Sequence, residues 1–438
     1  MTLLAIAATL LVLVLLITRW QVNPFLSFLV AAIVAGVLLG VPPAEIPRAL
    51  EKGIGDMLGS IVVIVCLGAM FGKLIADSGA AQSITQLLMG WFGQKYLIWA
   101  MMITGFVVGI PLFYNVGFVL LVPLVFSVAY QTRLPAVYLG IPLLAALSVT
   151  HGFLPPSPAP TALVAHFGAD LGKTLIYGLI LAVPTVIIAG PLLAPFLKKI
   201  TAAPLATFTP RVMEEAELPG RFNSLATSLL PVLLIAISTL LPEAQLRQSA
   251  AGQMLLMLGN PLVVMLLSLA IASYTLGVAR KTSISSLMET YGAAVKDIAL
   301  ILLIVAGAGA LRQIFVESGA SQDIAASLEG ISLNPLILGW FVALVIRVCL
   351  GSATVAGLTA AGIVAPLVLA NPEINPNLMV LAIGSGSLMC SHVNDSGFWL
   401  YKEYFNLSLK ETFMSWTLME TLVGLVGLVG VLLLDLLV

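Results

Sequence analysis

The 438-residue chain is 60% hydrophobic and only 9% charged, with a net charge of −1. A soluble globular domain carries about 25% charged residues, so the composition excludes that class and predicts an all-α polytopic protein in a lipid bilayer. The balanced charge offers no basic surface for nucleic acid. Cys66, Cys349 and Cys390 lie in apolar runs at unrelated spacings, a pattern that favours buried thiols over disulfides or a metal cluster. We expect no metal site and no cofactor.

The first half of the chain, 1–197, contains apolar segments of about the 20 residues that cross a bilayer. Four uninterrupted ones fall near 2–19, 23–42, 54–76 and 174–197. The first lacks a basic n-region and a clear cleavage site, so we expect a membrane helix there and no signal peptide. Two more segments, 96–130 and 136–165, are interrupted by glycine, proline and polar residues. The polar stretch 198–223 follows, and we interpret it as a linker.

The second half, 224–438, repeats this order. Uninterrupted spans fall near 224–241, 255–279, 292–315 and 413–437, and interrupted ones at 334–370 and 377–400. Short matches recur at a nearly constant offset, among them Asn23-Pro24 with Asn260-Pro261, Ser78-Gly79-Ala80 with Ser318-Gly319-Ala320, Gln82 with Gln322, Trp99 with Trp340, and His151 with His392. The sequence therefore predicts an internal duplication.

The segments 96–130 and 334–370 decide the topology. Each is long enough for two short crossings, but a re-entrant hairpin fits as well. With re-entrant hairpins each half has five crossings, and an odd number makes the second half an inverted repeat of the first, as in many secondary transporters. Placing 198–223 in the cytoplasm collects most lysines and arginines inside, which agrees with the positive-inside rule and puts both termini outside.

Four interrupted elements are then expected to meet near the middle of the bilayer: two hairpin tips, and two broken helices at 148–161 and 385–397. Irregular polar backbone survives in a membrane only where protein surrounds it, and half-helix N-termini attract anions. For the break at 385–397, the alternative is that the helix simply leaves the membrane at Ser391. The predicted substrate-binding residues are Tyr114, Asn115, Ser148, Thr150, His151, Gly351, Ser352, Thr354, Ser391, His392 and Asn394.

Ionisable residues in these breaks are candidates for ion coupling. Asp395 is the one carboxylate within the four interrupted elements, and His392 titrates near neutrality; both are candidate proton-coupling groups. His151 is a candidate hydrogen-bond donor to substrate, although either histidine could instead make a purely structural hydrogen bond. Arg347, one turn before Gly351, could pair with Asp395, attract an anion, or reach out to the interface.

Several motifs resemble the gluconate permease family of bacterial proton symporters, over nearly the whole chain. They are Ser148-Val-Thr-His-Gly-Phe-Leu-Pro-Pro156, Gly351-Ser-Ala-Thr-Val-Ala356, Ser391-His-Val-Asn-Asp-Ser-Gly-Phe-Trp-Leu400, Leu67-Gly-Ala-Met-Phe-Gly-Lys73 and Glu403-Tyr-Phe-Asn-Leu407. The resemblance implies inverted repeats with re-entrant hairpins, a homodimer formed by scaffold domains, an elevator-like movement of transport domains, and a place in the bacterial inner membrane. Many members carry Glu in place of Asn115 and His in place of Ser157, and these departures put the exact sugar acid in doubt.

Together these observations predict a secondary transporter that imports gluconate or a related sugar acid with protons. The alternative is a sodium-coupled carrier of dicarboxylates or another small organic anion. The sequence contains no HExxH, GxSxG or phosphate-loop motif, so we expect no enzyme and no catalytic residues. Paired interrupted helices also argue against a channel, which has no need of two gated halves.

Overall fold

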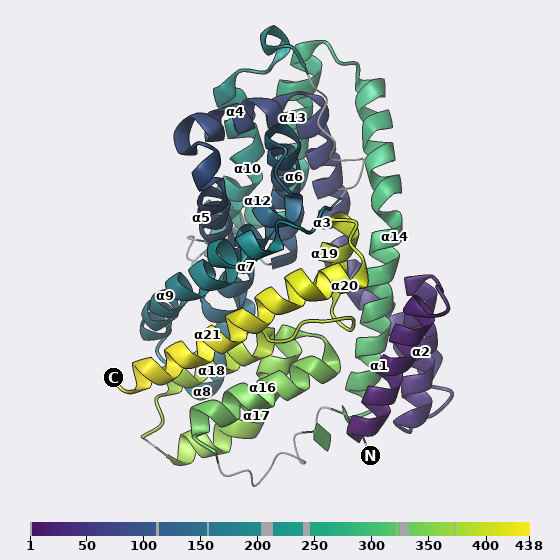
Figure 1. Ribbon diagram of the computed structural model, residues 1–438, viewed down its shortest axis with the longest axis vertical. Coiled ribbons are helices and arrows are strands. Elements are labelled where there is room, and N and C mark those ends of the chain that lie inside the picture. The colour runs from purple at the N-terminus through teal and green to yellow at the C-terminus, as the bar shows by residue number, and fades with distance from the viewer. Residues whose placement is uncertain are drawn as a thin grey trace. The chain divides into compact units, whose positions relative to one another are not determined.

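The computed structural model is helical throughout the part of the chain that it describes, namely residues 2–110, 114–155, 157–202, 213–239, 246–320, 323–324, 333–371 and 373–438, and these residues include no strand (Figure 1). The chain divides into two compact units, each built from separate stretches of sequence. The first comprises Met1–Ser60, Ser148–Leu193 and Leu300–Val438. The second comprises Ile61–Leu147 and Ala194–Ala299.

The helices up to the polar stretch are α1 (Thr2–Thr18), α2 (Pro24–Leu38), α3 (Ile46–Asp77), α4 (Ala80–Phe92), α5 (Leu97–Gly109), α6 (Tyr114–Thr132), α7 (Ala136–Phe153), α8 (Pro158–Phe167) and α9 (Leu171–Ile187). Those that follow are α10 (Arg221–Thr239), α12 (Ala250–Gly259), α13 (Pro261–Ala272), α14 (Ile284–Glu317), α16 (Pro335–Leu350), α17 (Ala353–Ala370), α18 (Pro376–Leu388), α19 (Ser396–Tyr404), α20 (Leu409–Thr412) and α21 (Leu418–Asp435). Single π-helical turns lie at Ile188–Leu192, Ser273–Gly277 and Phe413–Thr417.

Within the described residues, seven helical segments are long and apolar enough to cross a membrane, and several apolar helices are shorter. The predicted class, an all-α polytopic membrane protein, is confirmed. The inverted arrangement of the two halves, and the division into 1–197, 198–223 and 224–438, stay predictions.

Each of the four predicted interruptions contains a break between helices, but two are shorter than expected, because Ser148 to His151 belong to α7 and Ser385 to Leu388 to α18. These breaks separate α5 from α6, α7 from α8, α16 from α17, and α18 from α19. Local chemistry explains them: Gly351 ends α16 with a left-handed φ of 70°, and the Ser352 side chain caps the next helix. Residues 111–113 of the first hairpin tip and Pro156 of the proline run lie outside the described residues, as do Gln322 of the repeat matches and 203–212 of the linker.

One expectation about a single element was wrong, and one element was missed. The segment 255–279 was expected to be one uninterrupted span, but α12 ends at Gly259, and the Asn260 side chain accepts a hydrogen bond from the backbone N–H of Leu262 at 3.0 Å. Asn-Pro therefore begins a new helix there, since an Asn cap followed by Pro at the first position is a typical helix start. Helix α4 was not expected at all.

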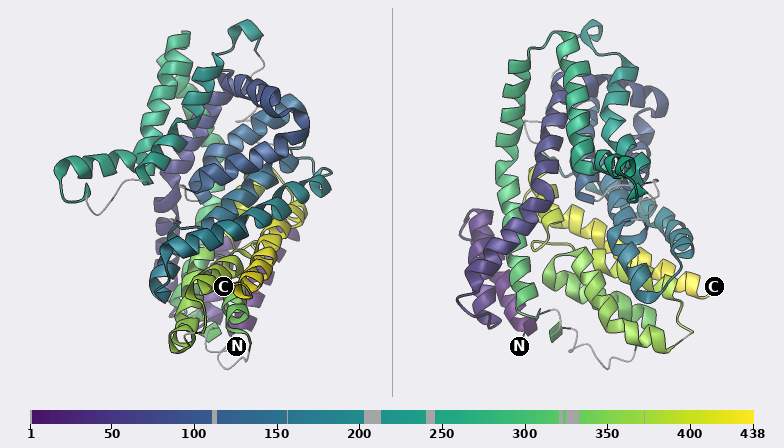
Figure 2. Two further views of the ribbon diagram at one scale, coloured as in Figure 1. Left: turned by 90° about the vertical axis from the view of Figure 1, so that its left-hand side faces the viewer. Right: turned by 180° about the vertical axis from the view of Figure 1, so that it is seen from behind.

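The part of the first unit that contains the C-terminal helices is packed through glycine. Helix α18 lies against α16, α17 and α21, which are the green to yellow helices in Figures 1 and 2. A Cβ on Gly386 would come within 2.3 Å of the Trp340 carbonyl oxygen, and one on Gly384 within 2.3 Å of the Gly152 carbonyl oxygen. The Trp340 indole N–H donates to the Gly424 carbonyl at 3.0 Å. Small residues thus allow the close helix contacts typical of membrane bundles.

The second unit has its own apolar core. It is formed by buried residues of α3, α4, α13 and α14, among them Leu67, Phe71, Leu74, Ala80, Met265 and Leu287. The end of the polar stretch packs on α4, where the Gln82 side chain donates to the Met213 carbonyl at 3.1 Å and the Ser83 hydroxyl donates to the Pro219 carbonyl at 2.8 Å. These bonds fix the chain before α10 begins.

We expect Gly386→Ala to destabilise the protein by about 1–3 kcal/mol, the usual effect of overpacking a close contact, because its Cβ would meet the α16 backbone. Gly362→Ala in α17 is the matched control, since nothing lies within 4 Å of its added Cβ, and it should be neutral or stabilising by up to about 1 kcal/mol. Thermal unfolding of the detergent-solubilised variants measures both. Equal unfolding temperatures would contradict the close α16–α18 contact.

Candidate functional site

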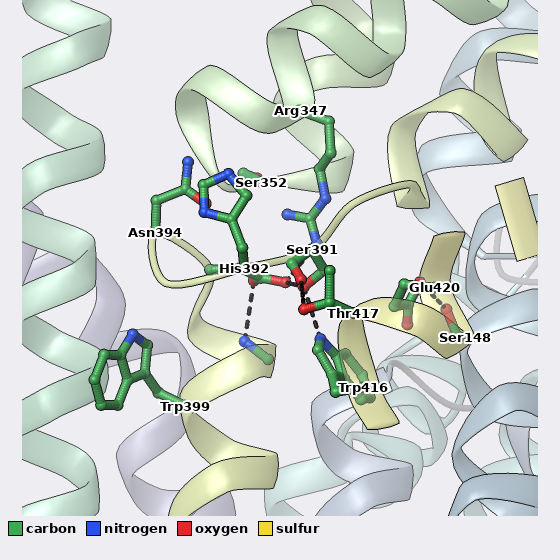
Figure 3. Close-up of polar contacts among 12 residues, drawn as sticks. Ser148, Arg347, Ser352, Ser391, His392, Asn394, Trp399, Trp416, Thr417 and Glu420 are labelled. Carbon is green, nitrogen blue, oxygen red and sulfur yellow. Dashed lines mark hydrogen bonds and ion pairs between the residues drawn. The ribbon is translucent and has the colours of Figure 1, made fainter. Parts of the chain in front are cut away.

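The break between α18 and α19 is held by side chains from a π-helical turn. Ser391 lies in this break, where its carbonyl accepts a hydrogen bond from the Thr417 hydroxyl at 2.6 Å and its hydroxyl oxygen accepts one from the Trp416 indole N–H at 2.8 Å (Figure 3). Both donors come from the turn Phe413–Thr417. Single π-turns inside helices often occur at functional sites. Here the turn brings two consecutive side chains onto one residue of the irregular segment.

A buried ion pair lies at the centre of the same segment. The Arg347 guanidinium donates through Nη2 to Asp395 Oδ2, and the two residues are 4% and 7% exposed. Asp395 Oδ2 also accepts from the Ser391 hydroxyl, and its Oδ1 accepts from the backbone N–H of Gly397 at 3.0 Å. Asp395 is therefore both the N-cap of α19 and the counter-ion of Arg347. Because Arg347 is buried inside the protein, it does not reach out to the membrane interface, and that interpretation is excluded.

Part of the hydrogen-bonding capacity in this cluster is unused. Arg347 Nε and Nη1 are buried, as is Asn394 Oδ1, and none of these atoms has a hydrogen-bond partner within the described residues. A buried polar group without a partner costs about 1–3 kcal/mol, and more when it is charged. In native proteins such groups usually have an ordered water, an ion or a ligand as a partner. An N–H of a guanidinium forms a strong, charge-assisted hydrogen bond with a carboxylate.

The helix break caps the end of the helix that leads into the hairpin tip. At the C-terminal end of α16, His392 Nε2 hydrogen-bonds to the Val348 carbonyl at 3.0 Å, and the Asn394 amide donates to the carbonyls of Val348 at 2.7 Å and Cys349 at 3.2 Å. Because a carbonyl only accepts, Nε2 of His392 carries a proton in this arrangement. A Cβ on Gly351 would lie 2.1 Å from the Asn394 carbonyl oxygen. The two irregular segments therefore form one contiguous cluster.

The N-terminus of α17 faces the same tip. Ser352 caps this helix by accepting a hydrogen bond from the Val355 N–H at 3.4 Å, and Thr354 is half-buried in its first turn. Free N–H groups at a helix start favour a nearby negative charge. This end of α17 can therefore contribute to holding an anion.

The end of α7 brings a second set of predicted residues into the first unit. Thr150 is buried, and His151 Nδ1 lies 3.1 Å from the Ser157 hydroxyl oxygen. The Ser148 hydroxyl donates to Glu420 Oε2 on α21 at 2.9 Å. His151, His392 and Glu420 each interact electrostatically with both Arg347 and Asp395. These five ionisable groups are thus linked through the field of one ion pair.

Sequence reasoning found most of this cluster but missed three residues: Trp416, Thr417 and Glu420. A signal existed for Glu420, because a lone carboxylate in an apolar span is a functional candidate by default. Tyr114 and Asn115 begin α6 in the second unit, where the Tyr114 and Phe118 rings are 6.1 Å apart. Their convergence with the other site residues stays a prediction. No group of three or more His, Cys, Asp or Glu residues that could hold a metal is found in the part of the chain described.

A sequence profile described as "GntP family permease" matches residues 1–437. The chain belongs to this family. It is 44% identical over 439 residues to the high-affinity gluconate transporter of Escherichia coli (strain K12), and 43% identical over 449 residues to the gluconate permease of Bacillus subtilis (strain 168), each alignment covering 100% of both chains. The Gnt-II system L-idonate transporter of Escherichia coli (strain K12) is 43% identical and is aligned over 99% of this chain and 98% of its own. These relatives are named as transporters or permeases, which agrees with the expectation that this chain is not an enzyme.

Gly351→Ala should disrupt the cluster formed by the hairpin tip and the helix break. Gly168→Ala is a matched control, because both glycines end a helix in the left-handed region, with φ of 70° and 61°, but nothing lies within 4 Å of a Cβ on Gly168. Left-handed backbone costs an alanine about 1–2 kcal/mol at either position. Any further fall in thermal unfolding temperature for the Gly351 variant measures the clash with Asn394, and identical behaviour of the two variants would refute that contact.

Proposed function

We propose that this GntP family permease transports gluconate or a closely related sugar acid across the bacterial inner membrane together with protons. The family assignment and the names of the relatives support the substrate class. The structural observation that carries the proposal is Arg347, a buried arginine with one arm on Asp395 and two donors without a partner. A substrate carboxylate accepts a charge-assisted hydrogen bond from one of those donors, and the guanidinium can hold it while Nη2 stays on Asp395.

The groups around Arg347 suit a polyhydroxylated chain attached to that carboxylate. The hydroxyls of Ser352 and Thr354 and the unused Asn394 Oδ1 can each bond a sugar hydroxyl. A site that bonds several hydroxyls rejects analogues that lack them, because its buried polar groups are then left unpaired. We propose that Tyr114, Asn115, Thr150 and His151 complete the contacts. The identities at Asn115 and Ser157 then tune which sugar acid is preferred.

Charge balance explains why protons accompany the substrate. Arg347 and Asp395 neutralise each other, so a bound sugar acid adds one uncompensated negative charge to a buried site. Uncompensated charge at membrane depth costs several kcal/mol. Taking up one proton together with each anion removes this cost. We propose that the charge of Asp395, together with its neighbour His392, governs this coupling.

We further propose that the two halves are inverted repeats whose hairpins and broken helices form the site, that both termini lie outside, and that the protein works as a homodimer. Transport would follow an elevator-type movement, in which a transport domain carries the site past a scaffold domain. The paired helix interruptions found in each half support this part of the proposal, since transporters built of inverted repeats bind their substrates at such breaks.

Uptake of radiolabelled gluconate into proteoliposomes tests the function. We expect accumulation when the outside is acidic relative to the lumen, its collapse when a protonophore is added, and no change when sodium replaces potassium. Protein-free liposomes are the control. Uptake that follows a sodium gradient, or a preference for dicarboxylates over gluconate, would support the sodium-coupled alternative instead.

Arg347→Lys should keep the charge opposite Asp395 but lose the guanidinium donor that bonds the substrate carboxylate. A hydrogen bond to a charged group is worth about 1.5–3 kcal/mol, so the loss of one such bond weakens gluconate binding at least about tenfold. Arg312→Lys, in α14 of the same unit, is the matched control. Isothermal titration of both purified variants measures the change, and unaltered affinity in the Arg347 variant would remove this residue from the site.

Asp395→Asn should reduce gradient-driven accumulation more than exchange of labelled for unlabelled gluconate. The variant lacks one negative charge near Arg347, so a substrate anion can enter without an accompanying proton. Ser415→Ala is a control for packing on the same elements, because this buried residue bonds Tyr401 and a helix carbonyl outside the ion pair. Equal loss of accumulation and exchange would argue for damage to the fold rather than to coupling.

A further inference from the structure

Glu420 is a second buried carboxylate beside the ion pair. It lies on α21, is 2% exposed, and accepts one hydrogen bond, from the Ser148 hydroxyl at 2.9 Å. In the described part of the chain no lysine, arginine or histidine forms a salt bridge with it. Figure 3 shows the Glu420–Ser148 pair next to Thr417, one turn along the helix from the residues that hold the break.

The two carboxylates have opposite environments. Asp395 has an arginine, a hydroxyl and a backbone N–H as donors, and this set stabilises the ionised form. Within the described residues, Glu420 accepts from a hydroxyl alone, which is too little to offset the removal of a full charge from water. Two titratable groups whose environments differ in this way take different roles: Asp395 suits a fixed counter-ion, and Glu420 suits a group that gains and loses a proton.

The charged groups around Glu420 can be assigned element by element. Arg347 on α16 and Asp395 before α19 both interact with it electrostatically. His151 on α7 and His392 in the break share the same two charged partners. Helix α18, which also packs on α21, carries no charged side chain, and α9 carries Lys173 in its first turn. One cation, Arg347, therefore interacts with both carboxylates, as the ion-pair partner of Asp395 and through its field with Glu420.

We propose that Glu420 carries the proton that enters with the sugar acid, while Asp395 stays ionised on Arg347. The proposal rests on the proposed function and deepens it. With Glu420 ionised, a bound sugar acid would make three negative charges around one cation. With Glu420 protonated, the sugar-acid carboxylate replaces the charge that Glu420 gave up, and the net charge of the buried site is unchanged. The anion and the proton therefore bind together and leave together.

Ser148 holds the Glu420 carboxylate in place for the gain and loss of its proton. Its hydroxyl holds the Glu420 carboxylate at the end of α7, three residues before His151. Deprotonation leaves Glu420 as an acceptor that needs this donor, and protonation lets it release the donor. The protonation state of Glu420 is thereby linked to helix α7, whose last turns carry the predicted substrate residues Thr150 and His151.

Glu420→Gln tests the proposal, because glutamine has the shape of a protonated glutamate and cannot release a proton. In wild-type protein, gluconate binding should weaken with rising pH, approaching about tenfold per pH unit once Glu420 is ionised, as expected for one linked proton. The variant should bind gluconate equally well at all pH values, keep exchange across proteoliposomes, and lose accumulation driven by a pH gradient. Glu411→Gln is the matched control, since Glu411 lies near the surface of the same segment and accepts hydrogen bonds from Ser408.

Ser148→Ala keeps the carboxylate but removes the donor that stabilises its ionised form. Gluconate binding by this variant should stay pH-dependent, with the pH at which binding weakens shifted upward. If Glu420→Gln does not fold, the Ser148→Ala variant tests by itself whether Glu420 carries the proton. An unshifted profile in Ser148→Ala, or a Glu420→Gln variant that still accumulates gluconate on a pH gradient, overturns the proposal.

The outcomes separate the proposal from the function on which it rests. If wild-type protein neither binds nor accumulates gluconate, the proposed function fails. If wild-type protein accumulates gluconate on a pH gradient and Glu420→Gln does the same, the function holds and the proton is carried elsewhere, with Asp395 and His392 as the remaining candidates.

Discussion

The structure of the first unit depends on one requirement: a buried positive charge must be neutralised where no water reaches it. Arg347 meets this requirement through Asp395, and Asp395 in turn begins α19 and binds Ser391. Removing one partner of a buried ion pair typically costs 3–5 kcal/mol, because the remaining charge is left uncompensated. The pair therefore fixes three things at once: the end of the hairpin, the course of the irregular segment and the start of the following helix.

Backbone groups in the two interruptions follow the same rule. An interrupted helix leaves free carbonyls and N–H groups, and hydrocarbon offers them no partner. The free carbonyls at the end of α16 are bonded by His392 and Asn394, and the Ser391 carbonyl is bonded by Thr417. The break between α18 and α19 thus supplies caps for the end of α16, and the π-turn supplies one for the break. Polar side chains have an unfavourable free energy in hydrocarbon, but here they stabilise the irregular backbone by bonding its free carbonyls and N–H groups.

The sequence predicted where helices break better than it predicted what the polar residues do. Glycine, proline and serine act locally, so the ends of α16 and α18 could be placed from the sequence alone. His392 was expected to couple ions or to make a structural bond, and the structure places its ring on the Val348 carbonyl. Arg347 had three open interpretations until its burial and its contact with Asp395 separated them.

Long-range partners could not be predicted in this way. Ser148 and Glu420 are far apart in the chain and meet only because α7 and α21 belong to one unit. No periodicity or composition encodes that meeting. Helix α4 was missed for a different reason: it is short, and its apolar positions are interrupted by Gln82, Ser83 and Thr85, so no segment of spanning length marks it.

The π-turn at Phe413–Thr417 has an optical consequence. It holds the buried Trp416 indole against Ser391 by a direct hydrogen bond, and indole emission responds to the polarity and bonding around its N–H. Of the six tryptophans in the chain, this one bonds a side chain of the helix break itself. The protein therefore carries an intrinsic fluorophore in the helix break of the proposed site, and its emission maximum can be followed in real time without attaching a dye.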